Sequence, residues 1–263
     1  MRNVNYYLRM AHYALLYSLI AFLFFSINTA FAADKFSFAV FGDNRDGDEV
    51  FIDLINRLNS DPSLAFAVNT GDLVPYGREA EYKKYLAMTK KLNIKLYNVP
   101  GNHDLVAGGY KYYLKYIGPY YYSMDYSNSH FIFLNNAFKE SFDTEQFSWL
   151  KKNLEDTKQE HIFVFMHRPT FDPSEIYSGY VMSGRQVAEE LIRLFERYKV
   201  NYVFAGHIHG YAKARRGSVN YVVTAGAGAP LYLPREIGGI FHYTKITVDG
   251  DEIIDEVKMI YGE

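Results

Sequence analysis

Five short apolar segments of this chain end in the same way, at a glycine or methionine followed directly by a side chain that can bind a metal ion. These segments are FSFAVFG before Asp43, FAVNTG before Asp72, NVPG before Asn102 and His103, IFVFM before His167, and YVFAG before His207 and His209. Short apolar runs bounded by glycine are typical of buried strands. Because the carboxyl ends of parallel strands lie at one edge of a sheet, these side chains are predicted to converge on a single site.

Strand-like and helix-like segments alternate over the first part of the chain. Strands are predicted at 36–41, 64–68 and 94–99, with helices at 49–58 and 79–92 between them. This alternation is typical of an α/β domain with a parallel sheet.

The second part of the chain is richer in strands. We predict a hairpin of 120–126 with 130–134, a helix at 144–154, a strand at 161–165, a helix at 185–198, and strands at 202–204, 218–224, 241–248 and 252–259. Two sheets packed face to face, with helices outside them, are therefore expected. For the tyrosine-rich run 110–122 we expect paired aromatic strands, the alternative being stacking on a substrate ring.

Composition limits the kinds of partner and metal site. The 263 residues are 49% apolar, which suffices for the core of one domain. Lys and Arg total 28 against 30 Asp and Glu, and no long basic run is present, so there is no strong signal for nucleic-acid binding. The chain has no cysteine, and its carboxylate, amide and imidazole groups suit Mn, Fe, Zn or Ni ions.

The N-terminal residues differ from the rest of the chain. Arg2 and Arg9 precede an uncharged apolar stretch, and Ala30 and Ala32 fit the cleavage site of an export signal. We predict a signal peptide at 1–32 and a periplasmic or secreted domain at 33–263. The alternative is an uncleaved anchor at residues 10–33, because a bilayer is spanned by about 20 apolar residues. Membrane contact is expected only in that case.

Motifs at the five strand ends occur in an order that resembles a known family. They are GDNR at 42–45, GDLVPYG at 71–77, GNHD at 101–104, MHRP at 166–169 and GHIH at 206–209. Over residues 36–259 the chain resembles the calcineurin-like metallophosphoesterase family. The resemblance implies a four-layer α/β/β/α sandwich of two mixed sheets, and an enzyme that hydrolyses phosphate mono- or diesters.

The resemblance also implies a site with two divalent metal ions. One ion would be held by Asp43, Asp72 and His209, and the other by Asp72, Asn102, His167 and His207. A hydroxide bridging the ions would attack the phosphoester. His103 would protonate the leaving oxygen, and Asp104 would orient the imidazole of His103.

The first motif departs from the family at its third position, where Arg45 replaces the usual histidine ligand. A guanidinium group cannot coordinate a metal, so the first ion is expected to be held more weakly. Arg45 is predicted either to bind a phosphate oxygen or to pair with Asp46 or Asp48. Asn102 and Arg168, at the ends of two apolar segments, are further candidates for binding substrate.

The predicted function is that of an exported, metal-dependent phosphoesterase acting on a small phosphoester. One alternative is a metal- or phosphate-binding module, catalytically weakened by Arg45. Another is a membrane-anchored phosphatase of lipid-linked or cell-wall phosphates. The presence of His103 and Asp104 favours an enzyme, because a binding module needs no general acid.

Overall fold

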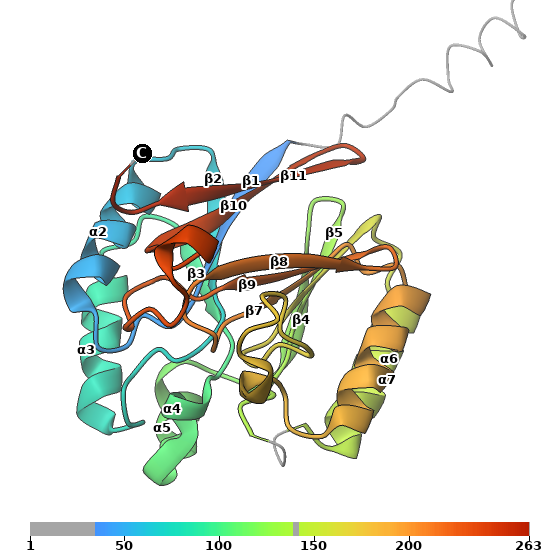
Figure 1. Cartoon of the computed structure of the whole chain (residues 1–263), viewed down its shortest axis with the longest axis horizontal. Helices are drawn as coiled ribbons and strands as arrows, with labels where there is room; N and C mark the ends of the chain where they lie inside the picture. Colours follow the sequence, from blue (N-terminus) through green and yellow to red (C-terminus); the bar gives the residue numbers. More distant parts are fainter. Residues whose placement is uncertain (1–34, 139–141, 263) are drawn as a thin grey trace, which may run out of the picture. The chain divides into compact units, whose positions relative to one another are not determined.

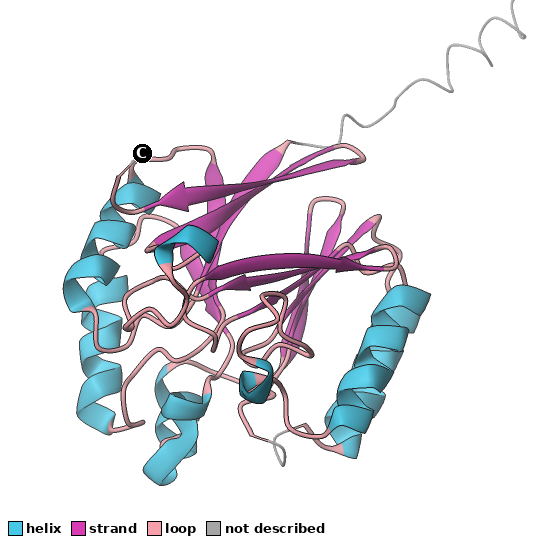
Figure 2. Ribbon diagram, viewed as in Figure 1, coloured by secondary structure: helices cyan, strands magenta, loops and turns pink. Residues whose placement is uncertain are grey.

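The computed structural model describes residues 35–138 and 142–262, so the signal or anchor predicted at the N-terminus lies outside the described residues. Two sheets lie between two layers of helices, as Figures 1 and 2 show. This arrangement confirms the predicted α/β fold, a four-layer α/β/β/α sandwich. Within the described residues, no helix combines the length and apolar character needed to cross a membrane.

The first sheet has the strand order β11-β10-β1-β2-β3. Its parallel strands are β1 (Phe36–Phe41), β2 (Leu64–Asn69) and β3 (Lys95–Asn98), and its antiparallel strands are β10 (His242–Asp249) and β11 (Glu252–Met259). The helices α2 (Asp48–Asn59), α3 (Glu79–Thr89) and α5 (Tyr110–Tyr116) pack together on this side of the molecule.

The second sheet has the order β4-β5-β6-β7-β9-β8. The strands are β4 (Tyr122–Tyr126), β5 (Ser129–Phe133), β6 (His161–Phe165), β7 (Tyr202–Ala205), β8 (Tyr211–Arg216) and β9 (Val219–Thr224). The four central strands are parallel, whereas the edge strands β4 and β8 are antiparallel to their neighbours. The helices α6 (Thr144–Asp156) and α7 (Arg185–Arg197) cover the outer face.

Alternating side chains place each central strand in two layers of the core. In β1, Phe38 belongs to the cluster between the sheets, whereas Phe41 packs with the helices. In β6, Phe163 packs between the sheets, whereas Val164 packs with the helices. A strand buried on both faces has a continuous apolar sequence, and this is why the strands that carry the motifs stand out in the chain.

Two of the longer elements differ from the sequence-based expectations, besides the short helix α4 (Asn102–Leu105) and three 3-10 turns among the described residues that were not predicted. Residues 110–116 form helix α5 instead of an aromatic strand, because Tyr112, Tyr113 and Tyr116 recur at helical spacing and pack in one core cluster. Strand β8 was not predicted, since its sequence YAKARR is polar and mostly exposed, as is common in edge strands. The other predicted helices and strands are confirmed to within three residues at each end.

Candidate metal centre

The carboxyl ends of four strands, β1, β2, β6 and β7, bring two groups of metal-binding side chains together. One group contains Asp72, His167 and His207, and the other contains Asp43, Asp72 and His209. Within each group the ligand atoms lie within 4.8 Å of one another. Asp72 belongs to both groups, so its carboxylate is placed to be shared by two ions.

Backbone carbonyl groups fix the protonation of two of the imidazoles. Nδ1 of His167 lies 2.9 Å from the carbonyl oxygen of Thr70, and Nδ1 of His209 lies 2.6 Å from that of Pro230. A carbonyl oxygen only accepts hydrogen bonds, so in both rings the Nδ1–H donates, and in the neutral form of each ring Nε2 carries the free electron pair. Such carbonyl contacts commonly orient imidazoles that bind metals.

Three electron-pair donors meet at Nε2 of His167. Nδ1 of His207 lies 3.1 Å from this atom, and Oδ1 of Asn102 lies 3.2 Å from it. Burial is the main cause that lowers the pKa of His207 to about 2, which favours a neutral ring. Nδ1 of His207 can donate a hydrogen bond to Nε2 of His167, or these atoms and Oδ1 of Asn102 can direct their electron pairs to a cation, so the three residues fit a metal ion.

In the other group, the surroundings of Asp43 also suit a metal ion. Its side chain is fully buried, and its Oδ2 accepts the backbone N–H of His207 at 3.0 Å. Its Oδ1 lies 3.3 Å from Nε2 of His209 but has no hydrogen-bond partner among the described residues. Burial raises the pKa of Asp43, but the contact with His209 and the neighbouring imidazoles lower it to about 2. A buried, unpartnered carboxylate oxygen is costly unless a cation binds it.

The backbone of three ligands is in an unusual conformation, and glycines surround it. Asp43, Asp72 and His207 have φ angles of 60°, 56° and 70°, in the left-handed region that residues other than glycine seldom occupy. A Cβ atom on Gly101 would lie 2.2 Å from Oδ1 of Asp72, and one on Gly206 would lie 2.4 Å from Oδ2 of Asp43. Both glycines are therefore needed for the carboxylates to approach the backbone.

Asp104 does not make the expected contact with the imidazole of His103. Its two carboxylate oxygens accept the backbone N–H groups of Gly101, Asp72, Leu73 and Val74 at 2.7 to 3.0 Å. Burial and the charge of Asp72 raise the pKa of Asp104, against the effect of these N–H groups. Asp104 thus joins the loop after β2 to the loop after β3.

A backbone carbonyl takes the place that was expected for Asp104. Nδ1 of His103 lies 2.6 Å from the carbonyl oxygen of Pro75, and the backbone N–H of His103 donates to Oδ1 of Asp72 at 2.9 Å. His103 is therefore anchored at two points to the loop that carries the shared carboxylate.

Arg45 pairs with the shared carboxylate as well as with a neighbour. Its Nε lies 3.2 Å from Oδ2 of Asp72, and one of its terminal nitrogens lies 2.8 Å from Oδ2 of Asp46. Of the two predicted partners, Asp46 is the one in contact, since Asp48 pairs with Lys84 instead. Although burial lowers the pKa of Arg45, the charges of Asp72 and Asp43 raise it above its ordinary value.

Arg168 is half-buried beside the centre. Its Nε donates to the carbonyl oxygen of Ala137 at 2.8 Å, and its charge acts on His207. Asn136 was not predicted from the sequence, although its Oδ1 accepts the backbone N–H groups of both His167 and Arg168 at 3.0 Å. Like the metal-binding residues, it is a polar residue that follows an apolar strand, which is a signal by which it could have been found.

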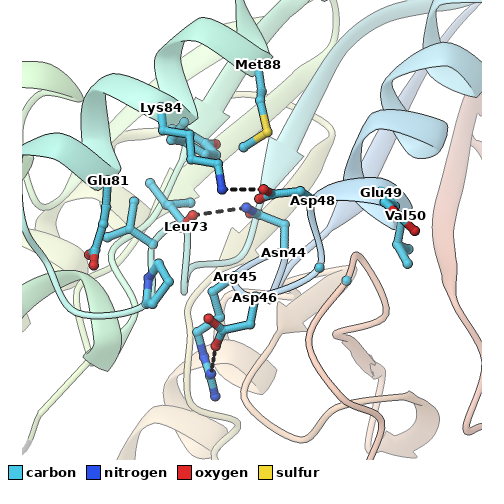
Figure 3. A pocket seen from close by; sticks show the side chains of 15 residues that line it. Asn44, Arg45, Asp46, Asp48, Glu49, Val50, Leu73, Glu81, Lys84 and Met88 are labelled. Carbon is cyan, nitrogen blue, oxygen red and sulfur yellow. Dashed lines mark hydrogen bonds and ion pairs between the residues drawn. The ribbon is translucent and has the colours of Figure 1, made fainter.

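A cavity of about 620 Å³ lies next to Arg45, between the loop after β1 and the helices α2 and α3. Figure 3 shows the ion pair of Lys84 with Asp48 and the hydrogen bond from Asn44 to the carbonyl oxygen of Leu73, both in its wall. None of the residues of the two ligand groups lines this cavity.

Comparisons with known proteins show the family to which this chain belongs. A family model described as calcineurin-like phosphoesterase matches residues 36–211. The serine/threonine-protein phosphatase CPPED1 of Rattus norvegicus is 30% identical over 204 residues, which cover 70% of this chain and 65% of that protein. The Fe(3+)-Zn(2+) purple acid phosphatase 12 of Arabidopsis thaliana is 30% identical over 137 residues, covering 47% of this chain and 28% of that protein. The matched regions span less than two thirds of either relative.

A solved structure shares the fold. The purple acid phosphatase from yellow lupin (Lupinus luteus) has a TM-score of 0.72 and 16% sequence identity, over 87% of this chain and 52% of that one. With the family match over most of the described domain, the expected metallophosphoesterase is confirmed: the chain belongs to the calcineurin-like phosphoesterase family.

Proposed function

We propose that this protein hydrolyses small phosphoric esters with the help of two divalent metal ions. The observation that carries the proposal is the carboxylate of Asp72, shared by two groups whose potential ligand atoms lie within 4.8 Å of one another. Bound divalent ions would supply Lewis-acid polarisation of the phosphoryl group and activation of water. The carboxylate, amide and imidazole donors suit Mn, Fe, Zn or Ni, and a related protein is an iron–zinc phosphatase.

His103 is proposed as the general acid. The carbonyl oxygen of Pro75 holds Nδ1–H, so Nε2 is the nitrogen left to deliver a proton to the leaving oxygen. Asp104 is proposed as a positioning residue, because it holds the loops of Asp72 and His103 without contacting the imidazole.

Two guanidinium groups are proposed to bind the phosphoryl group of the substrate. Arg45 and Arg168 are both half-buried, and the charge of each acts on Asp72. Arginine matches the geometry of phosphate oxygens with paired N–H groups. Since Arg45 also occupies Oδ2 of Asp72, we propose that the ion bound by Asp43, Asp72 and His209 is the weaker one.

Metal analysis combined with hydrolysis tests this function. Purified protein would be assayed with 4-nitrophenyl phosphate and bis(4-nitrophenyl) phosphate, after loading with Mn²⁺, Zn²⁺, Ni²⁺ or Fe²⁺. We expect metal-dependent hydrolysis of at least one ester, loss of it in Asp72→Asn, and no change in Asp251→Asn, an exposed aspartate in a turn. Metal binding without hydrolysis of either ester would instead support the binding module.

We also propose that the protein is exported. The support is the sequence before residue 33, with two arginines, an apolar stretch and an A-x-A site. Cell fractionation with mass determination of the mature N-terminus tests this. A start at or near Ala33 is expected, whereas recovery of the intact chain in the membrane fraction would support an anchored phosphatase.

A further inference from the structure

Two tyrosine rings border the histidines of the GHIH motif. The ring of Tyr232 stacks on the imidazole of His209, with centroids 3.9 Å apart and an angle of 20° between the planes. The ring of Tyr180 lies 5.9 Å from that of His207 and 5.5 Å from that of Tyr232, at 61° to the latter. We call Tyr180 and Tyr232 the aromatic corner.

A third tyrosine holds the aromatic corner in place. The hydroxyl of Tyr177 donates to the carbonyl oxygen of Tyr232 at 2.9 Å, and its ring meets that of Tyr180 at 5.7 Å and 84°. The backbone N–H of Tyr180 donates to the carbonyl oxygen of Tyr177 at 2.8 Å. Contacts therefore join the segment after β6 to the loop that carries Tyr232, and the two rings are positioned before any ligand arrives.

The ring of Tyr180 is available to a ligand. It is 43% exposed although it lies beside a buried centre, while Tyr177 and Tyr232 are half-buried. An exposed aromatic ring forgoes the stabilisation that burial would give, so its fixed position beside the metal ligands calls for an explanation. Tyr232 lies near the charged groups of the centre, since the charges of Arg45, Asp43 and Asp72 act on the pKa of its phenol.

The inference rests on the proposed phosphoesterase function and adds a substrate class to it. We propose that the aromatic corner binds a flat ring in the organic part of the substrate, so that aryl or nucleoside esters are preferred to alkyl esters. Aromatic stacking would then contribute a preference of about 3- to 10-fold in affinity. If the rings served only to support the two imidazoles, no such preference would exist.

Binding of two phosphonates to the Mn²⁺-loaded protein tests the inference by calorimetry. Phenylphosphonate and methylphosphonate carry the same anionic group, and only the first has a ring. We expect the phenyl compound to bind about 3- to 10-fold more tightly to the wild type and to Tyr180→Phe. In Tyr180→Leu, which keeps bulk but no ring, the preference for the phenyl compound should be diminished.

Matched controls separate the ring from the segment that carries it. Ile176→Ala removes a side chain that is 51% exposed in the same segment, and it should keep the preference. Equal affinities in the wild type, or an undiminished preference in Tyr180→Leu, would overturn the aromatic subsite. Failure of both phosphonates to bind would contradict the phosphoesterase function itself, and with it the inference.

Two further ligands identify the source of the ring. Adenosine 5′-phosphate and ribose 5-phosphate would be compared as inhibitors of 4-nitrophenyl phosphate hydrolysis. A lower inhibition constant for the adenosine compound, lost in Tyr180→Leu, would assign the corner to a nucleobase. If the two inhibition constants are equal but phenylphosphonate still binds more tightly than methylphosphonate, the aromatic corner would be assigned to a simple aryl group.

Discussion

Nε of Arg45 lies 3.2 Å from Oδ2 of Asp72, so the carboxylate shared by both ligand groups is already paired with a fixed positive charge. This pairing stands where the family usually has a histidine ligand. A metal ion bound at Asp72 would compete with Arg45 for the same oxygen and would be repelled by its charge.

Arg45→His should therefore tighten the binding of the ion held by Asp43, Asp72 and His209. The substitution removes the positive charge and supplies a neutral imidazole, and both effects act in the same direction. Calorimetric titration of metal into the apoprotein measures the change, and Arg185→His, an exposed arginine on α7, is the control. Unchanged affinity would show that Arg45 does not oppose the metal. A higher Michaelis constant in the same variant would support phosphate binding by Arg45.

Asp72→Asn and His207→Ala should each abolish hydrolysis and lower the metal content. The first weakens the ligand that both groups share, and the second removes an imidazole from the group of Asp72, His167 and His207. Elemental analysis and turnover would be measured on the same samples. Near-native turnover of either variant at limiting metal would contradict the assigned centre.

His103→Ala should leave the metal content intact and lower the rate by about 10²- to 10⁴-fold on esters with poor leaving groups. An ester with a good leaving group needs no proton, so 4-nitrophenyl phosphate should be affected much less. Rates on a series of esters with leaving groups of different pKa give the measurement. Equal losses across the series would rule out the role of general acid.

Asp104→Ala should destabilise the domain by roughly 3 kcal/mol or more, because four buried backbone N–H groups lose their acceptor. Asp104→Asn keeps one acceptor oxygen, so its free energy of unfolding should fall less. Urea unfolding of both variants measures the free energy of unfolding. A loss below about 1 kcal/mol in Asp104→Ala would mean that the two loops do not depend on this carboxylate.

His242 should make the domain less stable in mild acid. Burial lowers its pKa to about 4, so between pH 6.5 and about 4 the unfolded chain binds a proton that the folded chain does not. Above pH 6.5, His242 is neutral in both states and does not lower the free energy of unfolding. As the pH falls towards 4, it lowers that free energy by up to about 3 kcal/mol. The free energy of unfolding would be measured with urea at pH 8 and at pH 5. It should change less between the two pH values in His242→Gln than in the wild type. The same difference in both would exclude His242 as its cause.

The sequence predicted most of the fold because the strands that carry the site are buried on both faces. Strands β1 and β6 have continuous apolar sequences that end at a ligand, and both were placed with their observed bounds. Strand β8 was not predicted because it is a polar edge strand. Helix α5 was not predicted because tyrosines occupy most of its positions, so its helical spacing is difficult to recognise.

The structure brings most of the predicted metal-binding residues together, but not all of their contacts could be predicted from the sequence. Short motifs identify Asp43, Asp72 and the histidines, whereas Pro75 and Pro230 contribute only carbonyl oxygens, which any residue type possesses. The same reason explains the error about Asp104. Its neighbour in sequence is His103, but its partners are backbone N–H groups that only the folded loops bring to it.

The hydrogen bonds to Asp104, Thr70 and Pro230 hold the loops and imidazoles through the protein's own atoms. Small metal-dependent domains differ, because their ligands come together only when the ion binds and the chain unfolds without it. Here the coordination geometry is preformed within a large apolar core. We therefore expect the domain to stay folded when any bound ions are removed or exchanged.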